Sequence, residues 1–238
     1  MFSWISPIEA GRKLLSPQLE TKRQLITDEK KALIPPPGRA TMTITLYGAG
    51  GGGSDGSIFF SYGSGGAGGD ITIVRDLPVD DLYTYTVGKG GESNMNGGST
   101  FLYHNGVLIA TAAGGEGGKQ GTPGTIIAKG GSKGTGQIPG GAGGDSILDF
   151  KGPTIGCGSG GGCGGANGST GNIKTAAPGG AGGNGGGKGG DSAVPGVAYA
   201  QSGSFPGGGG GGGNIGWEDL VPELAPAGEG GDGHITIS

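Results

Sequence analysis

Runs of glycine constrain this chain more than any other feature of its sequence. Glycine makes up 66 of the 238 residues, about four times its ordinary share of roughly 7%. Within the runs, residues other than glycine tend to recur at every third position, as Ala142 and Asp145 do, or Glu229 and Asp232. A period of three fits neither an α-helix nor a β-strand but matches polyproline II, which has three residues per turn. The runs therefore predict extended helices that pack side by side through backbone hydrogen bonds.

Disorder is the main alternative for so glycine-rich a chain. Hydrophobic residues make up only 32% of it and charged residues 14%, and such chains seldom bury enough apolar surface to offset the entropy of ordering. A disordered linker, however, predicts no fixed spacing of its other residues. Each ordered residue costs about 1–2 kcal/mol and each net hydrogen bond returns about 1 kcal/mol. We therefore expect a lattice only where strands clamp its ends.

Short segments that alternate β-branched or aromatic residues with other residues bracket the glycine runs and predict strands. Asn105-Gly106 lies between two such segments, and this pair is typical of a type I′ hairpin. The fold class expected is mainly β and irregular, with a small β module and a lattice of packed polyglycine or polyproline II helices. The predicted β module comprises 41–47, 70–112 and 234–238, and the lattice with its displayed loops comprises 48–69 and 113–233.

Residues 1–40 differ in composition from the glycine-rich domain at 41–238, and we interpret them as a short N-terminal attachment arm. A polar run with helix-forming residues ends at Pro35-Pro36-Pro37, where proline prevents a helix from continuing. No apolar run approaches the ~20 residues of a membrane span, and none of signal-peptide length follows a basic region. We therefore expect a chain without a membrane span or an export signal.

The order of strands and glycine runs places three inserts at the end of the lattice opposite the β module. A run that leaves a strand ends far from it, and the next run returns. The inserts assigned in this way are 54–62, 119–129 and 214–227. Aromatic and large apolar residues on loops suit recognition because they give large contact areas for few rotatable bonds. The candidate receptor-contact residues are Phe59, Phe60, Tyr62, Ile126, Ile127, Trp217 and Leu220.

Two alternatives remain for these residues: they could cover the end of the lattice as a small core, or form an oligomer contact. A second set of candidates comprises Phe150, Tyr199 and Phe205. Their position depends on how the chain crosses the middle of the domain.

Each glycine run carries the chain from one end of the lattice to the other. Because the number of runs is odd, the chain would arrive at the end opposite its last strand, so one further reversal is required in the middle part. The third-position spacing slips between Gly187 and Lys188, which favours a turn within 179–190. A turn between Cys157 and Cys163 is the alternative. In an unbroken polyproline II segment, six residues span ~19 Å, too far for a disulfide, so we expect free thiols.

The residue inventory gives little support to catalysis, metal binding or nucleic-acid binding. The segment 140–148 fits a calcium-binding nonapeptide, but such sites need adjacent stacked repeats, and the copies begin at 65, 140 and 186. The net charge is −4, and no basic stripe recommends nucleic acid. The sequence identifies no catalytic partner for His104 or His234. We expect no enzyme, no metal site and no cofactor.

Several segments, in this order, resemble the glycine-rich domain of bacteriophage tail-fibre and minor tail proteins. They are MTITLYGAGGGG, GSGGAGGDITIV, YTYTVGKGGES and the closing GEGGDGHITIS. The chain is also similar in kind to the tip adhesins of T-even-like phages, in which a polyglycine sandwich displays variable loops. The resemblance covers about residues 41–238.

The resemblance implies a receptor-binding protein of the phage tail tip, an adhesin made in the host cytoplasm and located in the virion. Residues 1–40 would bind a tail-fibre or tail-tip protein, and the loops would bind a bacterial surface receptor, either protein or glycan. A homo-oligomer is compatible with this role. The alternative is a structural minor tail or fibre-tip protein without direct receptor contact. A third interpretation, an antifreeze-like bundle, would need repeated small or threonine residues, which the inserts lack.

Overall fold

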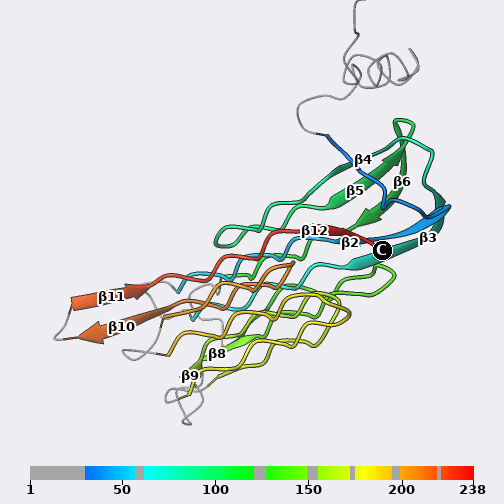
Figure 1. The fold of residues 1–238 in the computed structure, drawn as a ribbon. Helices are drawn as coiled ribbons and strands as arrows, with labels where there is room; N and C mark the ends of the chain where they lie inside the picture. Colours follow the sequence, from blue (N-terminus) through cyan, green and yellow to red (C-terminus); the bar gives the residue numbers. More distant parts are fainter. Residues whose placement is uncertain are drawn as a thin grey trace, which may run out of the picture.

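The computed structural model of the chain describes residues 30–56, 62–120, 127–148, 155–171, 175–194, 199–218 and 221–238. A group of strands lies at one end, and long extended segments run from it to the opposite end (Figure 1). The described part contains strands, turns and irregular segments but no helix, so the expected mainly β and irregular class is confirmed. No helix in the ranges above is long and apolar enough to cross a membrane.

Two antiparallel sheets form the β module. The first has the strand order β12-β2-β3, with β2 at Thr41–Tyr47, β3 at Ile71–Pro78 and β12 at His234–Ile237. The second has the order β1-β4-β5-β6, with β1 at Lys31–Ala32, β4 at Tyr83–Thr86, β5 at Thr100–His104 and β6 at Val107–Ala112. Because β12 pairs with β2, the last strand of the chain closes against the first strand of the predicted domain.

The turn between β5 and β6 has the backbone that its sequence predicts. Asn105 and Gly106 both have positive φ, at 48° and 84°, as the two central residues of a type I′ turn require. The predicted hairpin is therefore confirmed.

The core of the module lies between the two sheets. Alternate residues of β2 (Met42, Ile44 and Leu46) are buried and pack with Tyr83 and Leu102 of the other sheet, as the period of two in a half-buried strand requires. Leu33 belongs to the same buried cluster.

The position of Leu33 corrects the predicted extent of the N-terminal arm. We placed residues 1–40 outside the domain because three prolines follow Ile34. In the structure, β1 pairs with β4 and Leu33 is buried, so the part of this stretch from Lys31 onward joins the β module. Leu33 and β1 precede the three prolines in the chain, so the residues that join the core lie before the prolines and not after them.

The lattice is held by backbone hydrogen bonds that run in several directions from each segment. In the segment 63–69, three successive amides donate to three different segments: Gly66 N–H to Gly210 O, Ala67 N–H to Glu116 O and Gly68 N–H to Gly141 O, at 2.9, 2.8 and 2.9 Å. A β-strand bonds only to a neighbour on either side, whereas three directions match the threefold repeat of polyproline II.

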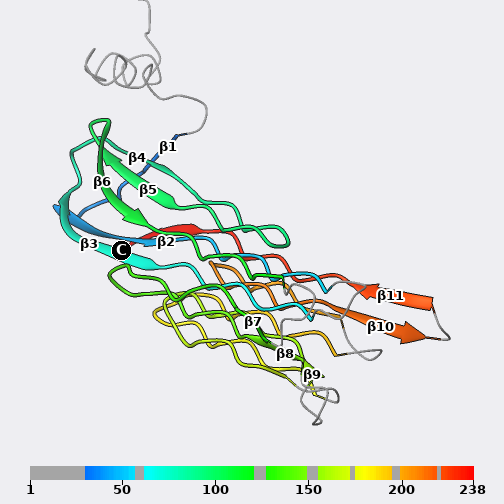
Figure 2. The same cartoon turned by 180° about the vertical axis from the view of Figure 1, so that it is seen from behind.

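Segments from nearly the whole domain take part in this bonding. They are 48–53, 63–69, 87–92, 95–99, 113–118, 129–134, 139–145, 157–162, 166–171, 176–182, 187–193, 199–204, 208–213 and 226–233. Figure 2 shows the long extended segments from behind, running from the β module toward the end that carries β10 and β11.

Two of these segments lie inside the stretch 70–112 that we assigned to the β module. Segments 87–92 and 95–99 form a short excursion into the lattice between β4 and β5. Gly91 N–H donates to Gly50 O, and Gly97 N–H donates to Gly115 O, both at 2.9 Å. Lys89 and Glu92 do have the third-position spacing, but the run is short and lies between two predicted strands, so we assigned it to the β module.

The reversal expected in 179–190 is present at Asn184-Gly185. These residues have φ of 47° and 81°, and Gly186 N–H donates to Gly183 O across the turn at 2.8 Å. Cys157 and Cys163 lie along one segment, 157–162 and the turn that follows it, and both thiols are free and buried. The predicted turn and the predicted free thiols are confirmed.

The chain also reverses at places that the sequence did not indicate, near Ile138, at Cys163-Gly164 and at Pro206-Gly207. Two of these reversals meet the β module at a second buried cluster, in which Ile138 and Cys163 pack with Tyr47 and Ile71. The chain therefore reverses more often than the single additional reversal predicted from the sequence.

Glycine is required in the lattice because neighbouring backbones occupy the space of a Cβ. A Cβ added at Gly51 would overlap the carbonyl oxygen of Glu116, and one at Gly66 would overlap that of Gly51. Some of the residues between such glycines, for example Ala181, are exposed, whereas others, such as Ala67, are buried. The third-position spacing thus marks the positions of each segment that leave room for a Cβ.

We expect Gly180→Ala to destabilise the protein much more than Ala181→Ser at the next position. The new methyl group at residue 180 would overlap Ala166 O, and overpacking of this kind costs about 1–3 kcal/mol or more. Ala181 is exposed, so its replacement should change the free energy of unfolding little. Urea unfolding of the two variants measures the difference, and equal stabilities would contradict backbone-to-backbone packing.

Candidate functional site: the insert end of the lattice

The described ends of the three predicted inserts lie toward the end of the lattice opposite the β module, which we call the insert end (Figure 1). The two strands of the third insert, β10 (Asn214–Glu218) and β11 (Val221–Ala225), pair there as an antiparallel hairpin. A small sheet with the order β7-β8-β9 also lies at this end (Figure 1). Its strands are β7 at Ile127–Ala128, β8 at Ser146–Leu148 and β9 at Ile155–Gly156.

The candidate contact residues are only partly covered by the structure. Phe59, Phe60, Ile126 and Leu220 lie outside the described residues, and so does Phe150 of the second set. Trp217 belongs to β10, for which the backbone pairing is described.

Of the remaining candidates, Ile127 begins β7 with 43% of its surface exposed, and Tyr199 is 65% exposed. Tyr62 is half-buried where the first insert returns to the lattice, and burial raises the pKa of its hydroxyl. Phe205 lies at the other end, at the Pro206-Gly207 turn, where its ring meets that of His234 at 4.8 Å between centroids. Phe205 is therefore not part of the insert end.

A pair of buried serines joins the roots of the first and second inserts. Ser54 and Ser64, on either side of the first insert, are both fully buried, and Ser64 N–H donates to Ser54 Oγ at 2.7 Å. Ser64 Oγ lies 2.8 Å from both Lys119 O and Lys129 O, the carbonyls at the two ends of the second insert. Ser64 Oγ also accepts a hydrogen bond from Lys119 N–H at 2.8 Å.

The third insert is tied to the same point through Ser54 and Asp55. Gly213 N–H, just before β10, donates to Ser54 O at 2.9 Å. Ala227 N–H, just after β11, donates to Asp55 Oδ1 at 2.8 Å, and Ser93 Oγ donates to Asp55 Oδ2 at 2.7 Å. The roots of all three inserts are thus joined by hydrogen bonds through Ser54, Asp55 and Ser64.

The charges that flank the second insert are paired. Lys119 Nζ lies 3.0 Å from Glu116, and Lys129 Nζ lies 2.7 Å from Asp145. Hydrogen bonds from Ser132, followed by that from Lys119, lower the pKa of Glu116 to about 2. Both lysines therefore face carboxylates.

The aspartate that closes each copy of the repeated glycine motif binds backbone amides of neighbouring segments. Asp70 accepts hydrogen bonds from Gly136 N–H and Gly140 N–H at 2.8 and 2.7 Å. Asp145 accepts one from Gly130 N–H at 3.0 Å. Charge-assisted bonds of this kind satisfy amides that face no carbonyl at the end of a segment. In the residues that the structure describes, no group of three or more His, Cys, Asp or Glu side chains could hold a metal ion.

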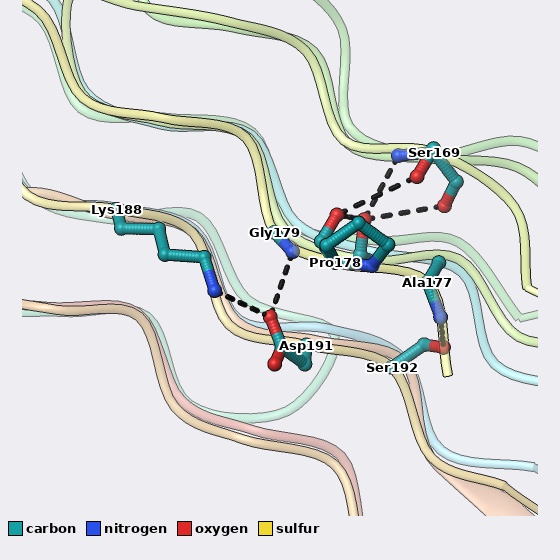
Figure 3. Close-up of polar contacts among 8 residues, drawn as sticks. Ser169, Ala177, Pro178, Gly179, Lys188, Asp191 and Ser192 are labelled. Carbon is teal, nitrogen blue, oxygen red and sulfur yellow. Dashed lines mark hydrogen bonds and ion pairs between the residues drawn. The ribbon is translucent and has the colours of Figure 1, made fainter. Parts of the chain in front are cut away.

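Figure 3 shows the third copy, in which the Asp191 carboxylate receives the Lys188 ammonium and Gly179 N–H, both at 2.8 Å. The next residue, Ser192, accepts Ala177 N–H at 2.8 Å. Partial burial alone would raise the pKa of Asp191, but the bonds from Lys188 and Gly179 outweigh it and lower that pKa. The carboxylate and the serine hydroxyl together bind two amides of the segment 176–182.

The two thiols and His104 have structural surroundings. Burial raises the pKa of Cys157 to about 12, and its Sγ donates to Gly213 O at 3.2 Å. Burial, with the nearby charge of Asp70, also raises the pKa of Cys163 to about 12. His104 lies 3.0 Å from Asp81 and stacks on Tyr83.

Sequence reasoning found the inserts but missed the residues that join their roots. Ser64 and Asp55 are single polar residues at the edges of glycine runs, and their partners lie 65 and 172 residues away in the chain. The only local signal is the position of a serine or aspartate where a run ends.

The model of a family described as a glycine-rich domain matches residues 27–238, and the chain therefore belongs to that family. The match begins inside the stretch 1–40, in agreement with the place of Leu33 in the module core. No curated protein matches the chain.

We expect Ser64→Ala to lower the free energy of unfolding by about 1–3 kcal/mol, the usual cost of leaving buried polar groups unsatisfied. The substitution removes the hydroxyl that faces Lys119 O and Lys129 O. Ser204→Ala, made at an exposed serine, is the matched control and should change stability little. Equal effects in urea unfolding would show that the serine pair does not hold the roots together.

Acidification should destabilise the fold as Glu116 and Asp191 become protonated. Both groups have a lower pKa in the folded chain than their ordinary values of 4.5 and 3.8. The folded state therefore binds fewer protons, and this contribution is present above the ordinary pKa values and is lost as the pH falls below them, for Glu116 toward about 2. Glu116→Gln should weaken the pH dependence of the melting temperature between about pH 5 and pH 2, whereas Glu92→Gln, at an exposed glutamate, should not. A Glu116→Gln profile identical to that of the original protein would contradict the assignment.

Proposed function

We propose that this member of the glycine-rich domain family is a receptor-binding protein of a phage tail tip, an adhesin that displays loops from a polyglycine scaffold. The observation that carries the proposal is the common root of three inserts at the end opposite the β module. Three inserts that begin and end at joined positions can present one composite surface. The resemblance to phage tail-fibre proteins supplies the biological setting.

The way the lattice is held supports a display role. Its segments are joined through backbone N–H and C=O groups, so, apart from Ser54 and Asp55 at the root of the first insert, these bonds do not depend on the side chains of the inserts. Inserts can therefore change in sequence while the scaffold remains the same. A rigid mount also lowers the entropy lost on binding, because the loop ends are already fixed.

The chemistry of the inserts supports binding to a surface. Ile127 and Tyr199 are exposed at or next to the insert end, and exposed apolar and aromatic groups are typical of interaction sites. We assign the contact role to Phe59, Phe60, Tyr62, Ile126, Ile127, Trp217 and Leu220. The receptor is a bacterial surface protein or glycan.

The opposite end would provide the attachment to the virion. Leu33 and β1 lie in the β module, at the end away from the inserts (Figure 1). We propose that the part of the predicted arm before Lys31 binds a tail-fibre or tail-tip protein. Attachment and recognition would then occupy opposite ends of one rigid body.

A structural minor tail protein is the second candidate function, and one observation favours it. Three consecutive apolar residues of β6, Val107, Leu108 and Ile109, are exposed on the β module, with Val107 at 66%. An apolar strand of this kind suits a contact within the virion. It does not involve the inserts.

Exchange of the inserts between related glycine-rich domain proteins separates the two candidates. If the chain is an adhesin, replacing 54–62, 119–129 and 214–227 together, with Ser54, Asp55 and Tyr62 retained, should transfer the host range of the donor phage. Replacement of the hairpin residues Asn105-Gly106 by Asp-Gly is the control and should leave host range unchanged. Adsorption to bacteria is the measurement, with circular dichroism to verify folding. Unchanged adsorption after exchange of folded inserts would contradict the adhesin proposal and support the structural one.

A further inference from the structure

Asn-Gly pairs occur at four places in the chain, at residues 96, 105, 167 and 184. Such pairs are chemically reactive because the amide nitrogen of glycine can attack the side-chain carbonyl carbon of the preceding asparagine. Glycine has no side chain to hinder this approach. The reaction requires that the glycine N–H and the asparagine amide be free to meet.

At Asn96 and Asn167, the glycine N–H that would attack is already hydrogen-bonded within the lattice. Gly97 N–H donates to Gly115 O at 2.9 Å, and Gly168 N–H donates to Ala142 O at 2.8 Å.

The side-chain oxygens of these two asparagines are engaged as well. Asn96 Oδ1 accepts a hydrogen bond from Gly117 N–H at 2.8 Å, and Asn167 Oδ1 accepts one from Ala142 N–H at 2.9 Å. Attack at either position must wait for the lattice to open locally.

The pair Asn184-Gly185 is arranged differently. It forms the tip of the turn between segments 176–182 and 187–193, and both residues are exposed. The hydrogen bond that closes the turn is donated by Gly186 N–H to Gly183 O. Across the described part of the chain, the structure gives Gly185 N–H no acceptor and the Asn184 side chain no partner.

From this contrast we infer that Asn184 is a site of spontaneous deamidation in the folded protein. The Gly185 nitrogen forms a bond to Asn184 Cγ, the bond from Cγ to the side-chain nitrogen breaks, and ammonia leaves with the proton from the Gly185 amide. Water then opens the resulting cyclic imide at one of its two carbonyls. The products are aspartate, or isoaspartate with an additional CH₂ in the backbone. The inference does not rest on the proposed function.

The position of the turn gives this modification a structural consequence. Tyr47 Oη donates a hydrogen bond to Asn184 O at 3.1 Å. Tyr47 ends β2 and packs in the buried cluster with Ile71 and Cys163, where the lattice meets the β module. An extra backbone atom at residue 184 would displace the carbonyl that Tyr47 binds, so isoaspartate should loosen this junction as the protein ages.

Peptide mass spectrometry of the full-length protein, stored folded in mildly alkaline buffer, tests the inference. Conversion of Asn184 to aspartate and isoaspartate should be at least about tenfold faster than conversion of Asn96 or Asn167, because local opening must precede attack at those two. In concentrated urea the three rates should become similar, which shows that the fold causes the difference. Equal rates in the folded protein, or an intact Asn184 in the folded protein that converts only in urea, would overturn the inference.

The variant Asn184→Gln provides the structural control, since the longer glutamine side chain cyclises far more slowly. The original protein should lose melting temperature on storage while N184Q keeps the value it had when fresh. An equal loss in both proteins would contradict the proposed effect on the junction.

Discussion

The hydrogen bond between the backbones of extended glycine segments is the interaction on which the rest of this structure depends. Each such bond contributes only about 1 kcal/mol net, close to the cost of ordering one residue. The lattice is therefore stable only if nearly every amide has a partner and the segments are held in register. Three successive amides of 63–69 reach three different neighbours, so a single segment helps to order several others. The pairing of β12 with β2 anchors the two ends of this arrangement in one sheet.

Polar side chains complete the bonding where the repeat of backbone groups ends. Asp70, Asp145 and Asp191 bind amides of neighbouring segments, and Ser64 binds carbonyls at the root of the second insert. These residues close the edges of the lattice at little cost in volume, because serine and aspartate are short. The inserts need to meet only these fixed positions, which leaves the rest of their sequence available for recognition.

Those parts of the fold that have a local signature could be predicted from the sequence. The third-position spacing indicated extended segments, Asn105-Gly106 indicated a hairpin, and the slip near Gly187 indicated a reversal that the structure has at Asn184-Gly185. Features set by distant contacts could not be predicted. Leu33 joins the module core from before the prolines, and Asp55 meets Ala227 from the other end of the chain. The excursion through 87–92 and 95–99 was missed because its short glycine runs lie between two predicted strands.

Amide hydrogen exchange of the folded protein tests most directly whether the glycine segments form a cooperative, hydrogen-bonded lattice. We predict that glycine amides of 48–53, 63–69, 157–162 and 208–213 are strongly protected and exchange together, with an opening free energy close to that of global unfolding. Far-separated segments should lose protection at the same denaturant concentration. Fast exchange of these amides at the rates of an unstructured chain, with protection confined to the strands of the β module, would contradict the account.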